Sequence, residues 1–122
     1  MTIIEAISQA DDLYRNNFST KQKVIWLSRC EAQIYHDVID RYEGGLDSFP
    51  GFTEESDMRT ELIMPQPYDE GYIHYLIAQI ANGYEEFDRY NNAIAIFNSR
   101  IEGFEKWWQK DHASASGKRF LF

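Results

Sequence analysis

The chain has 122 residues, the size of one ordinary domain. With 12 Lys and Arg against 20 Asp and Glu it carries a net charge of −8, so it is a poor candidate for direct binding to nucleic acid or to anionic membranes. An apolar fraction of 43% is too high for a wholly disordered chain. The single cysteine excludes an intrachain disulfide and any cysteine-rich metal site.

No run of about 18 apolar residues is present, so the sequence predicts no membrane span. The first dozen residues lack a basic start and include acidic residues, which is not typical of a signal peptide. We therefore expect a protein of a reducing interior, with no membrane partner and with Cys30 as a free thiol.

Two helices are predicted in the first 45 residues. Thr2 and Glu5 have the spacing of a capping box, and six apolar residues follow at helical intervals. Ser19 opens the second helix, which we expect to end at Gly44-Gly45 and in which Glu31 interrupts the apolar stripe. The expected buried face of the first helix is Ile3, Ala6, Ile7, Ala10, Leu13 and Tyr14.

The middle of the chain is acidic and irregular. Residues 46–70 hold seven acidic residues and one arginine, so this segment accounts for −6 of the net charge of −8. It also holds all three prolines of the chain. Residues 46–66 therefore predict an acidic loop, and the apolar run 62–64 leaves open a short hairpin or an extended segment pinned by Pro65. Glu54, Glu55 and Asp57 are interpreted as a solvated acidic loop, with contact to a basic partner as the second reading.

A third helix is expected to begin at Pro67 or Asp69 and to lead into the strongest periodic signal, at 73–108. Eleven positions there alternate spacings of three and four residues. A single helix of that length would span about 54 Å, so it either projects or folds back, and the Asn82-Gly83 pair favours a break at 82–86. The seam is Ile73, Leu76, Ile80, Gly83, Phe87, Tyr90, Ile94, Phe97, Ile101, Phe104 and Trp108.

The C-terminal part carries more large apolar residues than a small bundle easily hides. Trp107 and Trp108 are adjacent and point about 100° apart on a helix, so both cannot face one narrow core. Ser114–Gly117 has the composition of a flexible linker and leads to Phe120, Leu121 and Phe122. We expect one helical domain over 1–112 and a flexible tail over 113–122, with these aromatic residues at a protein–protein interface.

No catalytic or metal-binding constellation is recognisable. Glu70 and His74 share helical spacing, as do His36 and Asp40, but neither pair has the spacing of a known metal motif, and His112 is distant in sequence. The sequence has no nucleophile elbow and no glycine-rich phosphate loop. We therefore expect no enzyme activity, no cofactor, no metal and no small-molecule substrate. The sequence favours an all-α bundle of about four helices with a long C-terminal helix.

A series of short motifs resembles one family. The runs are W-L-S-R (26–29), Q-I-Y-x-x-V-I (33–39), P-Q-P-Y-D-E-G-Y (65–72), A-Q-I (78–80), N-G (82–83), R-Y-N-N (89–92), F-N (97–98) and F-x-x-W-W (104–108). In this order the sequence resembles the all-helical head–tail connector proteins of tailed bacteriophages and prophages. In this chain Gly71 stands where that pattern has a larger apolar residue.

The resemblance implies a ring-forming neck component without catalysis. Such a protein associates with its own copies, with the portal or with other neck and tail proteins, first in the host cytoplasm and then in the virion neck. Two alternatives remain open from the residues alone. One is a cytoplasmic helical adaptor that binds another protein without any phage connection, and the other is an enzyme or metal bundle using Glu70, His74 and His36.

Overall fold

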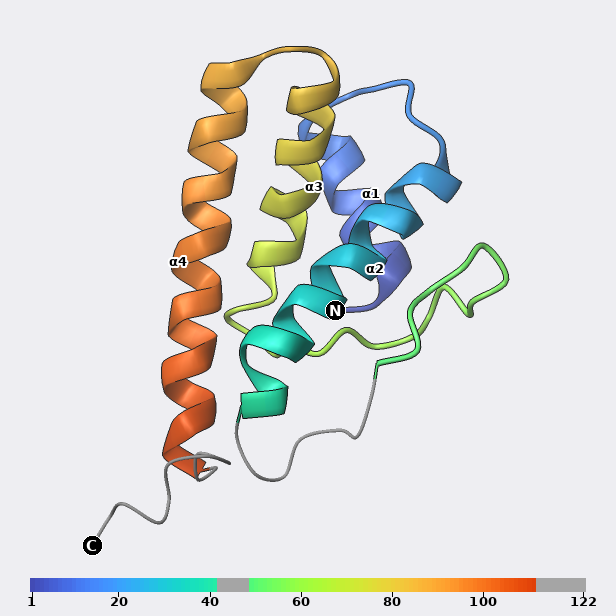
Figure 1. Ribbon diagram of the computed structural model, residues 1–122. Helices are drawn as coiled ribbons and strands as arrows, with labels where there is room; N and C mark the ends of the chain where they lie inside the picture. Colours follow the sequence, from blue (N-terminus) through green and yellow to red (C-terminus); the bar gives the residue numbers. More distant parts are fainter. Residues whose placement is uncertain (42–48, 112–122) are drawn as a thin grey trace, which may run out of the picture.

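The structure, a computed structural model, describes residues 1–41 and 49–111 (Figure 1). In these two ranges the chain forms helices and no strand. The all-α fold with a long C-terminal helix is confirmed. The elements are α1 (Ile3–Leu13), α2 (Thr20–Asp37), the 3₁₀ helix η1 (Ile39–Arg41), α3 (Glu70–Gly83) and α4 (Phe87–Asp111).

Both predicted N-terminal caps are present. The Glu5 amide donates to Thr2 Oγ1 at 3.2 Å, and the Thr2 amide donates to Glu5 Oε1 at 2.8 Å, which completes the capping box. The Gln22 amide donates to Ser19 Oγ at 3.1 Å at the start of α2. The first turns of both helices therefore begin where local sequence chemistry places them.

The predicted extent of the second helix is wrong. The α-helix ends at Asp37, and the chain turns at Val38 into η1, whereas Gly44-Gly45 lies outside the described residues. Val38 and Ile39 are both almost fully buried. The hydrogen bond from the Val38 amide to the Ile34 carbonyl closes the last α-helical turn, and the chain then continues as the 3₁₀ helix.

An irregular segment, residues 58–64, passes beside the start of α1, and we call it the strap. The Ile3 amide donates to the Thr60 carbonyl at 3.1 Å, and the Ile4 amide donates to the Met58 carbonyl at 2.9 Å. These amides belong to the first turn of α1, which has no partners for them within the helix. The only pairing of strand type among the described residues is the single bridge between Thr2 and Glu61, so residues 62–64 form no hairpin, and residues 63 and 64 are bends.

Helix α3 is central and packs against each of the other three α-helices. The arrangement is visible in Figure 1, where α4 lies on one side of α3 and α1 and α2 lie on the other. Gly71 permits the close approach of α4, because an added Cβ would lie 3.1 Å from Met64 Cε and 3.2 Å from Arg100 Cβ. Large, fully buried side chains at the centre of the core include Ile3, Leu27, Ile34, Met64, Tyr72, Leu76, Ile80, Phe97 and Phe104.

The predicted break at 82–86 is confirmed, but its chemistry differs from the expectation. The residue with positive φ is Glu85, at 60°, and not Gly83. Gly83 is instead required by packing, since an added Cβ would lie 2.5 Å from Phe18 Cζ. Two residues of the predicted apolar faces lie outside the core: Phe87, the first residue of α4, is 58% exposed, and Leu13, the last residue of α1, is 67% exposed.

Candidate interaction surface

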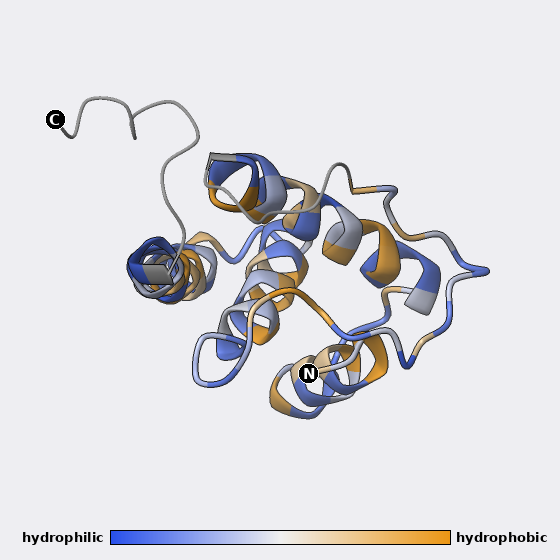
Figure 2. Ribbon diagram, turned by 90° about the horizontal axis from the view of Figure 1, so that it is seen from below, coloured by the Kyte–Doolittle hydropathy of each residue, from blue (hydrophilic) through white to orange (hydrophobic). Residues whose placement is uncertain are grey.

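Helix α4 lies at the edge of the molecule and packs mainly on α3. Seen from below, its outer side is largely hydrophilic and its apolar residues face the other helices (Figure 2). The buried line on α4 includes Phe97 and Phe104. A second line on the same helix, rotated from the first, carries Ile96, Gly103 and Trp107. This second line borders the surface described next.

The two tryptophans near the end of α4 diverge, as helix geometry requires. Trp107 is 41% exposed, with its ring stacked on Phe104 at 6.0 Å between centroids and 6.1 Å from the ring of Tyr68. Trp108 is half-buried on the other side of Phe104, at 5.9 Å. Trp107 thus presents an aromatic face to the surface while Trp108 contributes to packing.

Two hollows lie one above the other along the second line of α4. The lower hollow, about 300 Å³, is lined by Pro67, Tyr68, Glu70, Ser99, Arg100 and Gly103. The upper hollow, about 260 Å³, lies between the end of α1, the middle of α3 and the first half of α4. We call the two together the α4 furrow. Residues lining the upper hollow include Leu13, Tyr14, His74, Ile77, Arg89, Asn92, Ala93 and Ile96.

The upper hollow is apolar with a single fixed positive charge. The Arg89 guanidinium lies 4.2 Å from the centre of the Tyr14 ring, and the Tyr14 hydroxyl donates to the Glu86 carboxylate. Burial, and then the hydrogen bond to Glu86, raise the pKa of Tyr14. Burial also lowers the pKa of His74, which favours the neutral imidazole. No carboxylate is among the residues lining this hollow.

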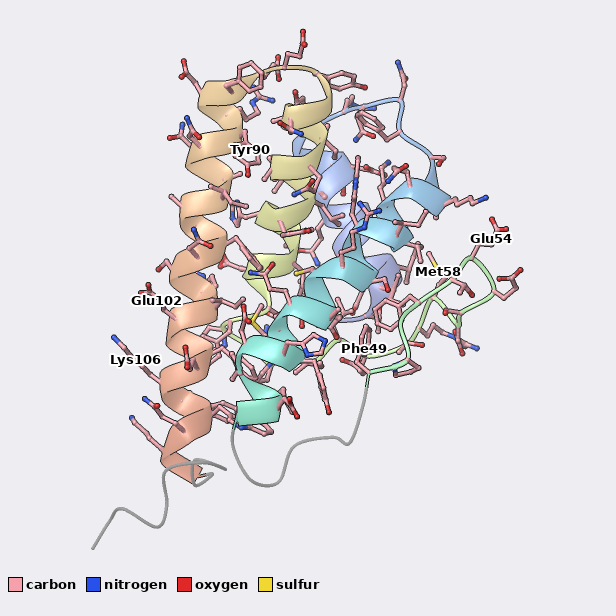
Figure 3. All side chains as sticks on the ribbon, viewed as in Figure 1. Phe49, Glu54, Met58, Tyr90, Glu102 and Lys106 are labelled. Atoms are coloured by element: carbon pink, nitrogen blue, oxygen red, sulfur yellow. The ribbon has the colours of Figure 1, made fainter. Side chains whose placement is uncertain are left out.

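The acidic loop is a separate surface. Glu54, Glu55 and Asp57 are all exposed. Asp57 Oδ1 accepts from the Arg59 amide at 2.9 Å, and this hydrogen bond lowers the pKa of Asp57. Figure 3 shows Glu54 at the tip of the loop, on the side of the molecule opposite Glu102 and Lys106 of α4. The predicted interface residues Glu54, Glu55 and Asp57 are therefore not brought together with Trp107, and Phe120, Leu121 and Phe122 lie outside the described residues.

The residues considered for metal binding do not converge. Across 1–41 and 49–111 no group of three His, Cys, Asp or Glu side chains is placed to hold an ion. The Glu70 carboxylate lies 3.8 Å from Arg100, and His36 makes an edge-on ring contact with Tyr35. His112 is outside the part of the chain that is described.

Among the described helices, none is long and apolar enough to cross a membrane.

A buried carboxylate was missed by the sequence reasoning. Glu31, taken as an interruption of the α2 stripe, is 1% exposed. Its Oε1 accepts from the Tyr72 hydroxyl at 2.5 Å and its Oε2 accepts from the Ile63 amide at 2.8 Å. The Tyr72 hydroxyl in turn accepts from the Met64 amide at 2.8 Å. Glu31 therefore joins α2, α3 and the strap, and burial raises its pKa to about 7.

The available signal for Glu31 was weak. A glutamate at an apolar position, directly after Cys30, indicates either an exposed gap in the stripe or a carboxylate that must find partners inside. Its partners come from 32 and 41 residues farther along the chain.

Comparison of the chain with family models, with characterised proteins and with solved structures finds no match. The connector resemblance therefore stays a prediction from the motifs.

Proposed function

We propose that the protein is a non-catalytic structural component of a tailed phage or prophage, a head–tail connector that acts in virion assembly through protein–protein contacts. The motif series supplies the family. The observation that carries the proposal is the separation of two unlike surfaces: the acidic loop around Glu54 lies on one side, and Glu102 and Lys106 of α4, the helix that also carries Trp107, lie on the other (Figure 3).

Two unlike surfaces are what a ring subunit needs. In a ring each copy meets its neighbour head to tail, so one patch contacts a different patch rather than itself. Trp107 offers a large, partly exposed ring of the kind enriched at interface centres. The acidic loop offers a charged contact that orients a basic partner during encounter. In this role the protein is made in the host cytoplasm and ends in the virion neck.

The experiment is assembly with a portal protein from the same genome. The two proteins are mixed and imaged by electron microscopy, and purified particles are analysed for this chain by mass spectrometry. Trp107→Ala should abolish or weaken joining, whereas Lys106→Ala, one residue away and exposed, should leave it intact. The protein's absence from purified virions, or normal virions formed without its gene, would end the proposal.

The second candidate is a cytoplasmic helical adaptor unrelated to phages. The exposed ring of Trp107 favours this candidate as much as the connector, because a partly exposed indole suits an apolar contact with any protein partner. The gene neighbourhood separates the candidates. Portal, terminase and capsid genes nearby support the connector, and their absence supports the adaptor.

A further inference from the structure

We propose that the α4 furrow is the docking site for this chain's own C-terminal segment, with Phe120, Leu121 and Phe122 entering the upper hollow. The proposal does not depend on the connector function, because it concerns two parts of one chain. It begins from the surface that the fold leaves uncovered. At the upper hollow, Leu13 is 67% exposed and Ile96 is 37% exposed, although both border a concave apolar site.

The furrow lies along the side of α4 that faces back from the end of the described chain, and its nearest α4 residue, Gly103, is eight residues before Asp111. Trp107, Gly103, Arg100 and Ile96 follow one side of α4 at helical spacing, from the last turns of the helix back towards its start. The lower hollow lies beside Gly103 and the upper hollow beside Ile96. A segment that leaves α4 at Asp111 and reverses direction along this side meets the two hollows in turn.

The length of the remaining chain matches this span. At 1.5 Å per residue, the level of Gly103 is about 12 Å from Asp111 along α4, and the α4 residues that line the upper hollow, Ile96 to Arg89, lie at about 22–33 Å. Phe120 is nine residues beyond Asp111, and a Gly/Ser-type segment of that length has a root-mean-square span of about 15–18 Å and a maximum near 30 Å. The mean span therefore passes the lower hollow, an extended segment reaches the near half of the upper hollow, and tethering raises the effective concentration of the segment well above micromolar. At micromolar protein, the chain's own segment therefore occupies the furrow ahead of a second copy.

The order of charges in the segment also matches the furrow. Lys118 and Arg119 precede the apolar triplet, so they lie nearer to Asp111. The lower hollow has the carboxylate of Glu70, which is 52% exposed and shared with Arg100 at 3.8 Å. The upper hollow has Arg89 and no lining carboxylate, and the nearby Glu86 carboxylate is already bonded to the Tyr14 hydroxyl, so apolar rings suit this hollow better than a basic pair. This contrast favours basic residues beside Glu70 and aromatic residues beside Ile96.

Disulfide trapping in the full-length chain tests the proposal directly. Asn92→Cys combined with Phe122→Cys is oxidised at about 5 µM protein and analysed on non-reducing gels. Asn98→Cys with Phe122→Cys is the matched control, because Asn98 is also exposed, is closer to the end of α4, and lies on the opposite side of the helix. Cys30 does not compete, since it is fully buried.

The Asn92 pair is expected to form an intrachain disulfide at least fivefold faster than the Asn98 pair, and the product should remain monomeric. Equal rates for the two pairs would overturn the proposal. Disulfide-linked dimers as the main product would also overturn it, because the occupant would then be a second copy.

A stability cycle gives an independent test in the same full-length protein. Phe120→Ser with Phe122→Ser should lower the melting temperature by about 3–5 °C, because a docked segment stabilises only the folded state. In an Ile96→Asp background the same tail substitutions should lower it by less than 1 °C, whereas an Asn98→Asp background should retain the full shift. A tail effect that is unchanged by Ile96→Asp would refute docking in the furrow.

Discussion

Replacing Glu31 by glutamine should remove most of the pH dependence that this buried carboxylate imposes on stability. Glutamine has the shape of a protonated glutamate: its carbonyl can accept from the Ile63 amide and its amide can donate to the Tyr72 oxygen. The variant therefore mimics the neutral form of Glu31. Wild type and Glu31→Gln should have nearly equal free energies of unfolding at pH 4.5.

The raised pKa of Glu31 decides whether stability rises or falls with pH. Burial lifts the pKa of Glu31 from 4.5 to about 7, so between these values the folded protein binds a proton that the unfolded chain has released. The stabilisation from this group is complete below pH 4.5 and is lost as the pH rises through 7. A shift of about 2.5 pH units corresponds to about 3 kcal/mol.

Urea unfolding between pH 4.5 and 7.5 measures this difference. Glu31→Gln should become more stable than wild type by about 3 kcal/mol at pH 7.5, and Glu102→Gln, at an exposed position on α4, should follow the wild-type curve. Parallel curves for wild type and Glu31→Gln would show that the carboxylate is not desolvated and would refute the reasoning.

Three further substitutions test the fold. Phe97→Ala should cost about 3–5 kcal/mol because Phe97 is 1% exposed, and a loss below about 1 kcal/mol in urea unfolding would mean that the seam is not core. Trp107→Ala, at the partly exposed end of α4, should cost clearly less than Phe97→Ala in the same assay. Glu85→Gly should raise the free energy of unfolding by about 0.5–1 kcal/mol because it relieves a φ of 60°, and a destabilised variant would contradict this.

Features set by neighbours in the sequence were predictable, and features set by distant contacts were not. The caps at Thr2 and Ser19 and the break after Gly83 depend on a few adjacent residues. Leu13, the last residue of α1, is 67% exposed at the edge of the hollow that α1 forms with α3 and α4, which is a contact between distant parts of the chain. The early end of α2, at Asp37, has no stop residue in the sequence: Val38 and Ile39 follow, and both are buried in the core.

The candidate surface shows the same division. The divergence of Trp107 and Trp108 follows from helix geometry and was predicted. The upper hollow was not predicted, because it is assembled from three helices, α1, α3 and α4, and no sequence motif marks it. Leu13 was predicted to be buried because its helical spacing places it on the apolar face of the first helix. Spacing does not show how far that face is covered, and Leu13 lies at its uncovered end, beside the hollow.

The position of Tyr72 separates structural from functional residues within the resemblance. Tyr72, in the motif P-Q-P-Y-D-E-G-Y, is fully buried and holds Glu31 and the strap, so folding alone explains why a tyrosine is present there. Trp107, in F-x-x-W-W, is 41% exposed, so the core alone does not account for a ring of that size. Substituting Tyr72 should therefore abolish folding and assembly together, whereas substituting Trp107 should separate them. Variants that test assembly should therefore be placed at the end of α4, not in the longest motif.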